Sequence, residues 1–137
     1  MLLRKADAKT EAGVMPGAEL LAAMGAYMGE MSKAGVLLAG EGLQPSTRGA
    51  RVKFTGGAPT VTDGPFPGDL LAGFCIIQVA SKEEAIEWVK RWPALDGDGG
   101  IEIEIRQVFE ADDFGEAFTP EMREAEERMR AEAESRS

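Results

Sequence analysis

Two apolar stretches limit the folds that this 137-residue chain can adopt: "VLLA" at 36–39 and "FCIIQV" at 74–79. A strand with one face in water alternates apolar and polar residues, and neither stretch alternates, so we expect both faces of each strand to be covered. Helices of the chain can cover one face, but a chain of this length has none to spare for the other. A second copy packed sheet to sheet about a two-fold axis is the economical cover, and the C-terminal segment is the alternative.

The order of the remaining segments predicts the fold class. We expect two βαβ units with a hairpin inserted between them, and we expect 11–17 to be a loop. The expected strands are 2–6, 36–42, 70–80 and 101–105, the hairpin is 50–55 with 59–62, and the helices are 18–34 and 82–92. Two such units make an α+β, ferredoxin-like split βαβ sandwich with helices on one face of the sheet. A helix at the C-terminus completes the expected architecture.

Local signals define the two inner helices. Gly35 is expected to end the first helix, and Ser81 to cap the second, with Glu84 reaching back to complete a capping box. The first helix also carries a stripe of small residues: Ala18, Ala22, Gly25 and Gly29. Because glycine inside a helix costs about 1 kcal/mol relative to alanine, the stripe predicts close approach of the sheet or of a partner helix.

Charge and composition exclude several classes of function. A net charge of −9 argues against binding to nucleic acid or to an anionic membrane surface. The chain has no histidine, which excludes a Ser-His-Asp triad and an imidazole base. We expect no cofactor and no metal site, because a zinc site without histidine and with one cysteine is improbable. An oxygen-only magnesium or calcium site stays open, although we expect 96–100 to be a loop.

The single cysteine and the absence of long apolar runs indicate the compartment. Cys75 lies in an apolar strand and is expected to be a buried, unreactive thiol rather than a nucleophile. The longest mostly apolar run, 70–80, is too short to cross a bilayer. The first residues show no signal-peptide pattern, so we expect a cytoplasmic protein with no membrane association.

The C-terminal segment predicts a charged helix. Thr119 is a typical N-cap residue with Pro120 in the first helical position, and Glu and Arg recur at i, i+4 spacing in the pairs 124–128 and 126–130. The apolar stripe is thin, with Met122, Ala125 and Met129. A solvated helix lying over a neighbouring element and a docking helix for another protein are both compatible with this pattern.

The stretch "VTDGPFPGD" at 61–69 concentrates turn residues around Asp63. Asp63 can accept hydrogen bonds from backbone N–H groups two residues on, which would make it a turn residue only. The alternative is a site in which Asp63 and Glu41 form a catalytic carboxylate pair that shares a proton or acts as acid and base. Further candidates for ligand binding are Phe66 as a pocket wall, Gln44 as a residue reaching into the pocket, and Arg48 or Arg106 as a clamp for an anion.

An ordered series of motifs gives the chain a family resemblance. "GVLLAGEGLQPS", "VTDGPF" with the following "AGF", "SKEEAIEW" and "IEIRQVFEADDFGE" together resemble the YCII-related family and, within it, the branch named for the Asp-Gly-Pro-Phe motif. The resemblance implies residues 1–114 as the family domain and 115–137 as a charged helix belonging to the same unit. It also implies homodimers that pair as dimeric α+β barrels.

The resemblance implies two kinds of function. Some family members resemble small-molecule enzymes, and many are associated with extracytoplasmic-function sigma factors. Here Pro67, Gly68 and Asp69 follow Phe66, where relatives commonly have a longer loop with a lysine, and the family's histidine partner of the aspartate is absent. A His-Asp proton transfer is therefore not transferable. We expect a homodimer that binds or converts a small molecule at Asp63 and Glu41, or alternatively a non-enzymatic regulatory or interaction module associated with such a sigma factor.

Overall fold

A computed structural model describes residues 1–137 and separates the chain into two compact units, Met1–Arg106 and Gln107–Ser137. The first unit contains the whole βαβ pattern and the hairpin, and the second contains the C-terminal helix. No helix is both long enough and apolar enough to span a membrane. The boundary expected between residues 114 and 115 stays a prediction.

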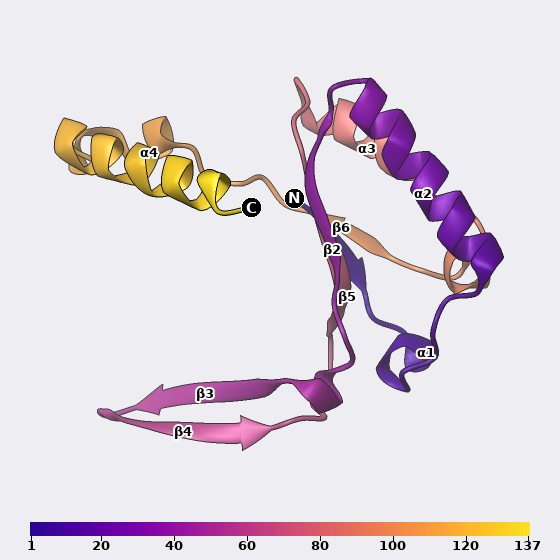
Figure 1. Cartoon of the computed structure of the whole chain (residues 1–137). Helices are drawn as coiled ribbons and strands as arrows, with labels where there is room; N and C mark the ends of the chain where they lie inside the picture. Colours follow the sequence, from indigo (N-terminus) through magenta and orange to yellow (C-terminus); the bar gives the residue numbers. More distant parts are fainter. The chain divides into compact units, whose positions relative to one another are not determined.

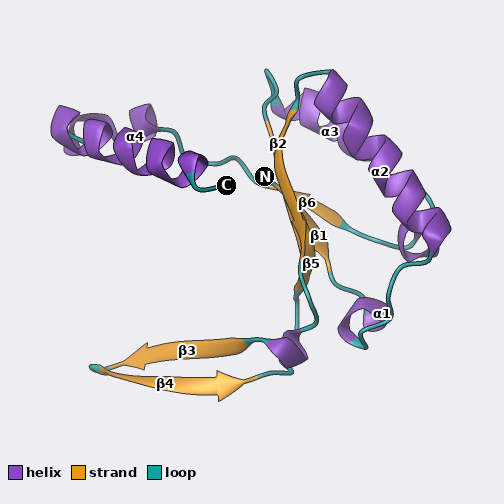
Figure 2. Ribbon diagram, in the orientation of Figure 1, coloured by secondary structure: helices purple, strands orange, loops and turns teal.

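The first unit is built on a four-stranded antiparallel sheet. Its strands are β1 (Leu2–Lys5), β2 (Leu37–Gly42), β5 (Leu71–Ile77) and β6 (Ile103–Ile105), in the order β2-β5-β1-β6. The helices are α1 (Ala8–Glu11), α2 (Ala18–Lys33) and α3 (Lys82–Lys90). Figures 1 and 2 show α2 and α3 on the same side of the sheet. The expected ferredoxin-like α+β fold is confirmed.

A separate two-stranded sheet is inserted between β2 and β5. It consists of β3 (Ala50–Thr55) and β4 (Ala58–Asp63), which pair in register around the turn at Gly56 and Gly57. Both glycines have positive φ, as a tight hairpin turn requires. The hairpin is therefore confirmed, and Asp63 is its last strand residue. Short 3₁₀ turns lie at Ser46–Arg48, Asp96–Gly99 and Ala111–Ala117.

The helix ends follow the sequence signals, with two differences. Gly35 adopts φ 72° just after the end of α2, and the Ser81 hydroxyl caps α3 by accepting from the Glu84 N–H at 3.1 Å. Glu84 reaches back one residue further than a capping box requires, accepting from the Ala80 N–H at 2.9 Å. Helix α1 lies between the expected first strand and the loop expected at 11–17, where the sequence predicted no helix. It forms because Asp7 and Thr10 make a capping box.

The hydrophobic core lies between the helices and one face of the sheet. Its fully or nearly buried apolar side chains are those of Leu2, Tyr27, Met31, Val36, Cys75 and Ala85. Tyr27, Met31 and Val36 form one cluster, against which both tryptophans and the end of β5 pack. The expected burial of Cys75 is confirmed, and burial raises the pKa of its thiol, as an unreactive core thiol requires.

Two expectations about burial concern elements that the single chain leaves uncovered. Residues 38–42 of β2 are exposed, because β2 is the edge strand of the sheet, and its expected cover by a second copy stays a prediction. A Cβ added at Gly25 or Gly29 would meet nothing within 4 Å, so no other element of the chain approaches α2 closely there. The small-residue stripe therefore does not pack against the sheet.

The second unit contains α4 (Pro120–Ser135), capped by the Thr119 hydroxyl, which accepts from the Met122 N–H at 3.2 Å. Its expected i, i+4 ion pairs are present, joining Arg128 to Glu124 and Arg130 to Glu126. An aromatic cluster precedes the helix in this unit. Its members are Phe109, Phe114 and Phe118, with centroids 5.1 Å apart for the first pair and 5.9 Å for the second.

The core cluster predicts a large effect of one methionine. Replacing the fully buried Met31 by alanine should lower the free energy of unfolding by about 3 kcal/mol, because a cavity remains where the side chain was. Met15→Ala, at a side chain 81% exposed in the same unit, should change it by less than about 0.5 kcal/mol. Urea denaturation of both variants checks this, and equal effects would contradict the core described above.

Candidate functional site: a cleft beside the Asp-Gly-Pro-Phe loop

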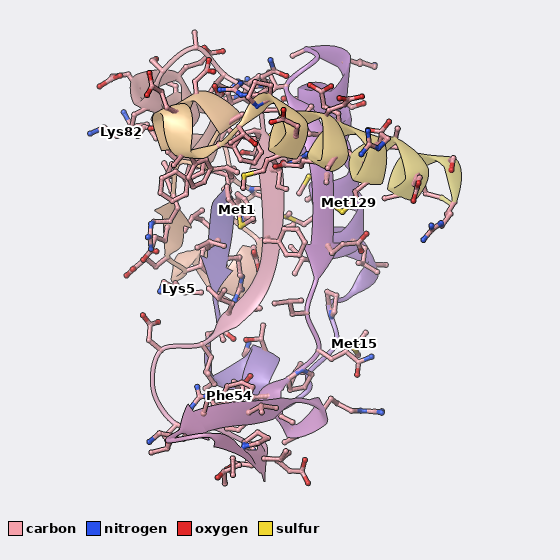
Figure 3. The ribbon with its side chains drawn as sticks, turned by 90° about the vertical axis from the view of Figure 1, so that its left-hand side faces the viewer. Met1, Lys5, Met15, Phe54, Lys82 and Met129 are labelled. Carbon is pink, nitrogen blue, oxygen red and sulfur yellow. The ribbon has the colours of Figure 1, made fainter.

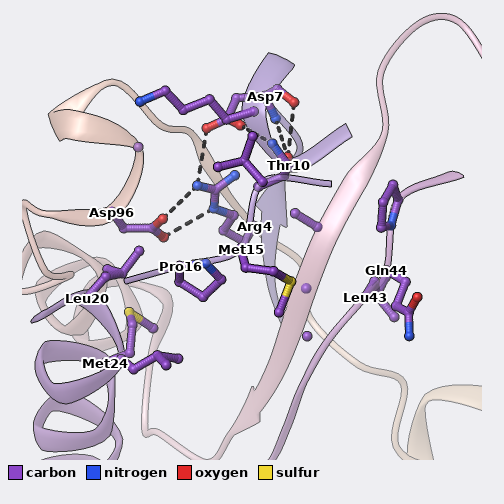
Figure 4. A pocket seen from close by; sticks show the side chains of 18 of the residues that line it. Arg4, Asp7, Thr10, Met15, Pro16, Leu20, Met24, Leu43, Gln44 and Asp96 are labelled. Atoms are coloured by element: carbon purple, nitrogen blue, oxygen red, sulfur yellow. Dashed lines mark hydrogen bonds and ion pairs between the residues drawn. The ribbon is translucent and has the colours of Figure 1, made fainter. Parts of the chain in front are cut away.

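The first unit contains an open cleft of about 1440 Å³. It is bounded by α1 with the segment that follows it, the N-terminal half of α2, the end of β2 and the loop after α3 (Figure 4). Its apolar wall includes Leu20, Leu21, Met24, Met28, Leu37 and Trp92. Its polar wall includes Arg4, Asp7, Glu11, Glu41, Gln44 and Arg48. An apolar wall with a few polar groups is the usual lining of a small-molecule site.

A buried ion pair forms one end of this cleft. The Arg4 side chain on β1 is held by two hydrogen bonds to the Asp96 carboxylate, from Nε at 3.1 Å and from a terminal nitrogen at 2.7 Å. Trp92 donates from its indole N–H to the same carboxylate at 2.9 Å. Arg4 also reaches Asp7 at 3.3 Å, so one guanidinium connects the central strand, the cap of α1 and the loop after α3. Both members of the main pair are buried.

The pKa values of this group follow from its contacts. Burial of Asp96 opposes ionisation, but hydrogen bonds from Arg4 and Trp92, together with the charge of Arg4, lower the pKa of its carboxyl below the usual 3.8. The hydrogen bond to Asp96 raises the pKa of Arg4. Both groups are therefore charged at neutral pH, and their donors and acceptors are used within the protein. They shape the end of the cleft and are not free to transfer protons.

Ser46 joins the cleft to the Asp-Gly-Pro-Phe loop. Its hydroxyl donates to Glu11 at 2.6 Å, and its backbone N–H donates to the other oxygen of the same carboxylate at 3.0 Å. The hydroxyl also accepts from the backbone N–H of Phe66 at 3.0 Å. One serine thus fastens the loop at 63–66 to α1, which lines the cleft.

Gly64 is required by this junction. A Cβ built on Gly64 would lie 1.7 Å from the carbonyl oxygen of Ser46, a distance that no side chain allows. The backbone at this point is also fixed by a hydrogen bond from the Gly64 N–H to the Gly49 carbonyl at 3.0 Å. The Phe66 ring, next along the loop, is covered by the Arg51 guanidinium at 4.1 Å from its centroid. The motif therefore makes a close backbone contact between two loops.

The structure places three of the six predicted site residues in the cleft and the other three outside it. Glu41, Gln44 and Arg48 line the cleft. Asp63 is exposed at the end of β4, directly opposite Ala50, and its side chain makes no hydrogen bond or ion pair within the chain. Phe66 is half-buried at the base of the hairpin, and Arg106 is exposed and pairs with Glu104 at 3.3 Å. Asp63, Phe66 and Arg106 are not part of the cleft lining.

The comparison with known families is consistent with this architecture. A family model described as the YCII-related domain matches residues 1–112. The chain belongs to the YCII-related family. A search of curated proteins gives no significant match. The narrower assignment to the Asp-Gly-Pro-Phe branch stays a prediction.

Sequence reasoning did not single out three residues that shape the site of this YCII-related protein. Arg4 and Asp96 are 92 positions apart, and only the pairing of β1 within the sheet brings them together. An arginine inside a short apolar strand was the available signal, because a buried guanidinium needs a carboxylate partner. Ser46 lies within "GLQPS", but its double contact with Glu11 and Phe66 depends on the loop geometry. No group of three or more histidine, cysteine or acidic side chains is arranged to hold a metal ion.

The Gly64 contact predicts opposite effects for two glycine-to-alanine changes. Gly64→Ala should destabilise the protein by about 3 kcal/mol, because the new methyl group overlaps the Ser46 carbonyl and the backbone must move. Gly25→Ala, inside α2 and with open space around it, should stabilise by about 0.5–1 kcal/mol. Thermal and urea unfolding of both variants test this. A Gly64→Ala protein as stable as the wild type would exclude the close contact.

The buried ion pair predicts a pH-dependent stability difference. Asp96→Asn should cost about 3 kcal/mol at neutral pH, because it leaves the buried guanidinium without a counter-charge. The folded protein lowers the Asp96 pKa, so the stabilisation is complete above the unfolded value of 3.8 and is lost as pH falls through the folded value. The difference from wild type should thus be constant from pH 7 to 5 and shrink below about pH 4.

The matched control for this prediction is Asp98→Asn. Asp98 pairs with Lys9 at 2.9 Å, but both side chains are largely exposed. Loss of this exposed ion pair should change the free energy of unfolding by less than about 1 kcal/mol at any pH. Urea denaturation from pH 3 to 7 gives both values, and an Asp96→Asn cost that does not depend on pH would argue against an ionised pair.

Proposed function

We propose that this YCII-related protein is a homodimer that binds a small molecule in the cleft beside the Asp-Gly-Pro-Phe loop. The observation that carries the proposal is the composition of the cleft wall, with Leu21 and Met24 on the α2 side and Gln44 on the opposite loop. Arg48 lines the cleft and has no hydrogen-bond or ion-pair partner for its side chain within the chain, so its charge is available to a ligand. Glu41 also borders the cleft, but it lies opposite Phe74, on the open face of the sheet. The favoured ligand has an apolar body and a polar end group.

Asp63 and Phe66 remain proposed site residues, although they do not line the cleft. Through Ser46 and Phe66, the loop that contains Asp63 is fastened to the wall of the cleft. A ligand that reaches from Gln44 towards the base of the hairpin would approach the Asp63 carboxylate. Catalysis by Asp63 and Glu41 together would require such a ligand between them. We therefore propose ligand binding, and the proposal does not depend on a reaction.

The pairing of two copies is supported by the face of the sheet that the helices leave open. Residues directly opposite one another in neighbouring antiparallel strands share a face, and Leu3 lies opposite both Phe74 and Glu104, while Phe74 lies opposite Glu41. The alternate residues Leu2 and Cys75 are buried on the helix side. Leu3, Phe74 and Ile76 therefore belong to the open face, and none of them is buried. Figure 3 looks onto the side from which this face is seen, with Met1 and Lys5 marking β1.

A protein-interaction role is the second candidate, and the second unit supports it. Phe109 is 72% exposed and Phe114 51% exposed, beside a helix dominated by Glu and Arg. Aromatic residues exposed in a cluster are typical of protein-binding surfaces. An extracytoplasmic-function sigma factor is the partner that the family resemblance implies. This role requires no ligand in the cleft, so a test of the cleft separates the two candidates.

The cleft predicts saturable binding of an uncharged apolar dye. Nile red should bind the wild-type protein with a blue-shifted emission, and Leu21→Glu should weaken its affinity roughly tenfold, because the new carboxylate lies in the apolar wall. Met129→Glu is the matched control, since Leu21 is 59% and Met129 62% exposed and both lie on helices. Fluorescence titration measures the affinities. Equal weakening in both variants, or no saturable binding, would remove the case for a ligand cleft and favour the interaction role.

A further inference from the structure

The hairpin β3–β4 has two chemically different faces. One face pairs Val52 with Val61 and Phe54 with Pro59, and the other pairs Arg51 with Thr62 and Lys53 with Thr60. The apolar side chains are far from buried: Phe54 is 75% exposed, Val61 64% and Val52 52%. A strand pair with one apolar and one polar face normally packs its apolar face against another element.

Nothing in the first unit provides that packing. Every residue from 50 to 63 is exposed, and the hairpin forms a two-stranded sheet of its own. The Gly64–Gly49 and Phe66–Ser46 hydrogen bonds close its base, and Ser46 joins that base to Glu11 of α1. An isolated two-stranded hairpin is at best marginally stable in water. The ordered ribbon therefore needs a covering surface.

We propose that the hairpin is an arm that lies on a second copy of the chain. The ribbon extends on the side of the sheet opposite α2 and α3, which is the side of the open face with Leu3 and Phe74 (Figures 1 and 3). If two copies meet through that face, each arm reaches past the interface onto its partner. This inference rests on the homodimer of the proposed function and adds a second contact to it.

Charge complementarity favours the same occupant. The arm and its base carry Arg48, Arg51 and Lys53 against one carboxylate, Asp63, whereas the whole chain has a net charge of −9. Arg51 and Lys53 extend from the face opposite Val52 and Phe54, so they act through long-range attraction of the arm to a strongly acidic body, which each copy supplies to the other. The arm contact itself covers the exposed apolar side chains.

Hydrogen exchange measured at different protein concentrations tests the arm. Above the dissociation constant of the dimer, the amides of 51–55 and 59–62 should exchange roughly tenfold more slowly than below it. Phe54→Thr, which puts a β-branched residue of high strand propensity in place of the aromatic ring, should weaken dimerisation roughly tenfold and remove this protection. Thr60→Val, on the opposite face of the hairpin, should change neither. Analytical ultracentrifugation gives the dissociation constants.

The possible outcomes separate the arm from the dimer. A dimer whose hairpin amides exchange rapidly at every concentration overturns the arm and leaves the proposed homodimer intact. Slow exchange of the hairpin amides that is equal at all concentrations also overturns the arm, because the chain's own residues then cover the apolar face. A monomer at all concentrations overturns both the arm and the homodimer. Concentration-dependent protection that Phe54→Thr abolishes supports the arm.

Discussion

The guanidinium of Arg4 lies on the helix-covered face of the central strand, where a charge is costly unless it is fully paired. Two hydrogen bonds to Asp96, a third to Asp7 and a fourth to the Lys5 carbonyl satisfy it. These partners come from the loop after α3, the cap of α1 and the strand itself. The position of α1 and of the 94–98 loop therefore depends on one buried ion pair, and both segments border the cleft.

The same ion pair accounts for the small apolar core. A charged pair and an open cleft lie beside the N-terminal half of α2, and burial is concentrated at the C-terminal half of α2 around Tyr27 and Met31. Tyr27 extends this end of the core by donating its hydroxyl to the Trp88 carbonyl at 2.6 Å, and burial raises the pKa of Tyr27 to about 12. One end of the helix layer thus supports the fold, and the other is available to a ligand.

The fold could be predicted from the sequence because its signals are local. Alternating and continuous apolar runs, the Gly56-Gly57 turn, and the caps at Ser81 and Thr119 each depend on a few neighbouring residues. The site could be predicted only in part. Glu41, Gln44 and Arg48 lie near a strand end and were found, but the pairing of Arg4 with Asp96 and of Ser46 with Glu11 depends on contacts between distant segments. The shortness of strand β6 and the exposure of strand β2 likewise depend on the order in which the strands pair in the sheet.

The junction at Ser46 has a consequence for how related sequences can diverge. Its hydroxyl bridges Glu11 and the Phe66 backbone, while its carbonyl leaves no room for a side chain at Gly64. A change at position 11 or 46 removes a hydrogen-bond partner of the other, whereas Gly64 is constrained by the backbone carbonyl of residue 46 whatever its side chain. Positions 11 and 46 are therefore expected to be retained or exchanged together, so the familiar tetrapeptide is the visible part of a longer signature whose other members lie upstream in the chain.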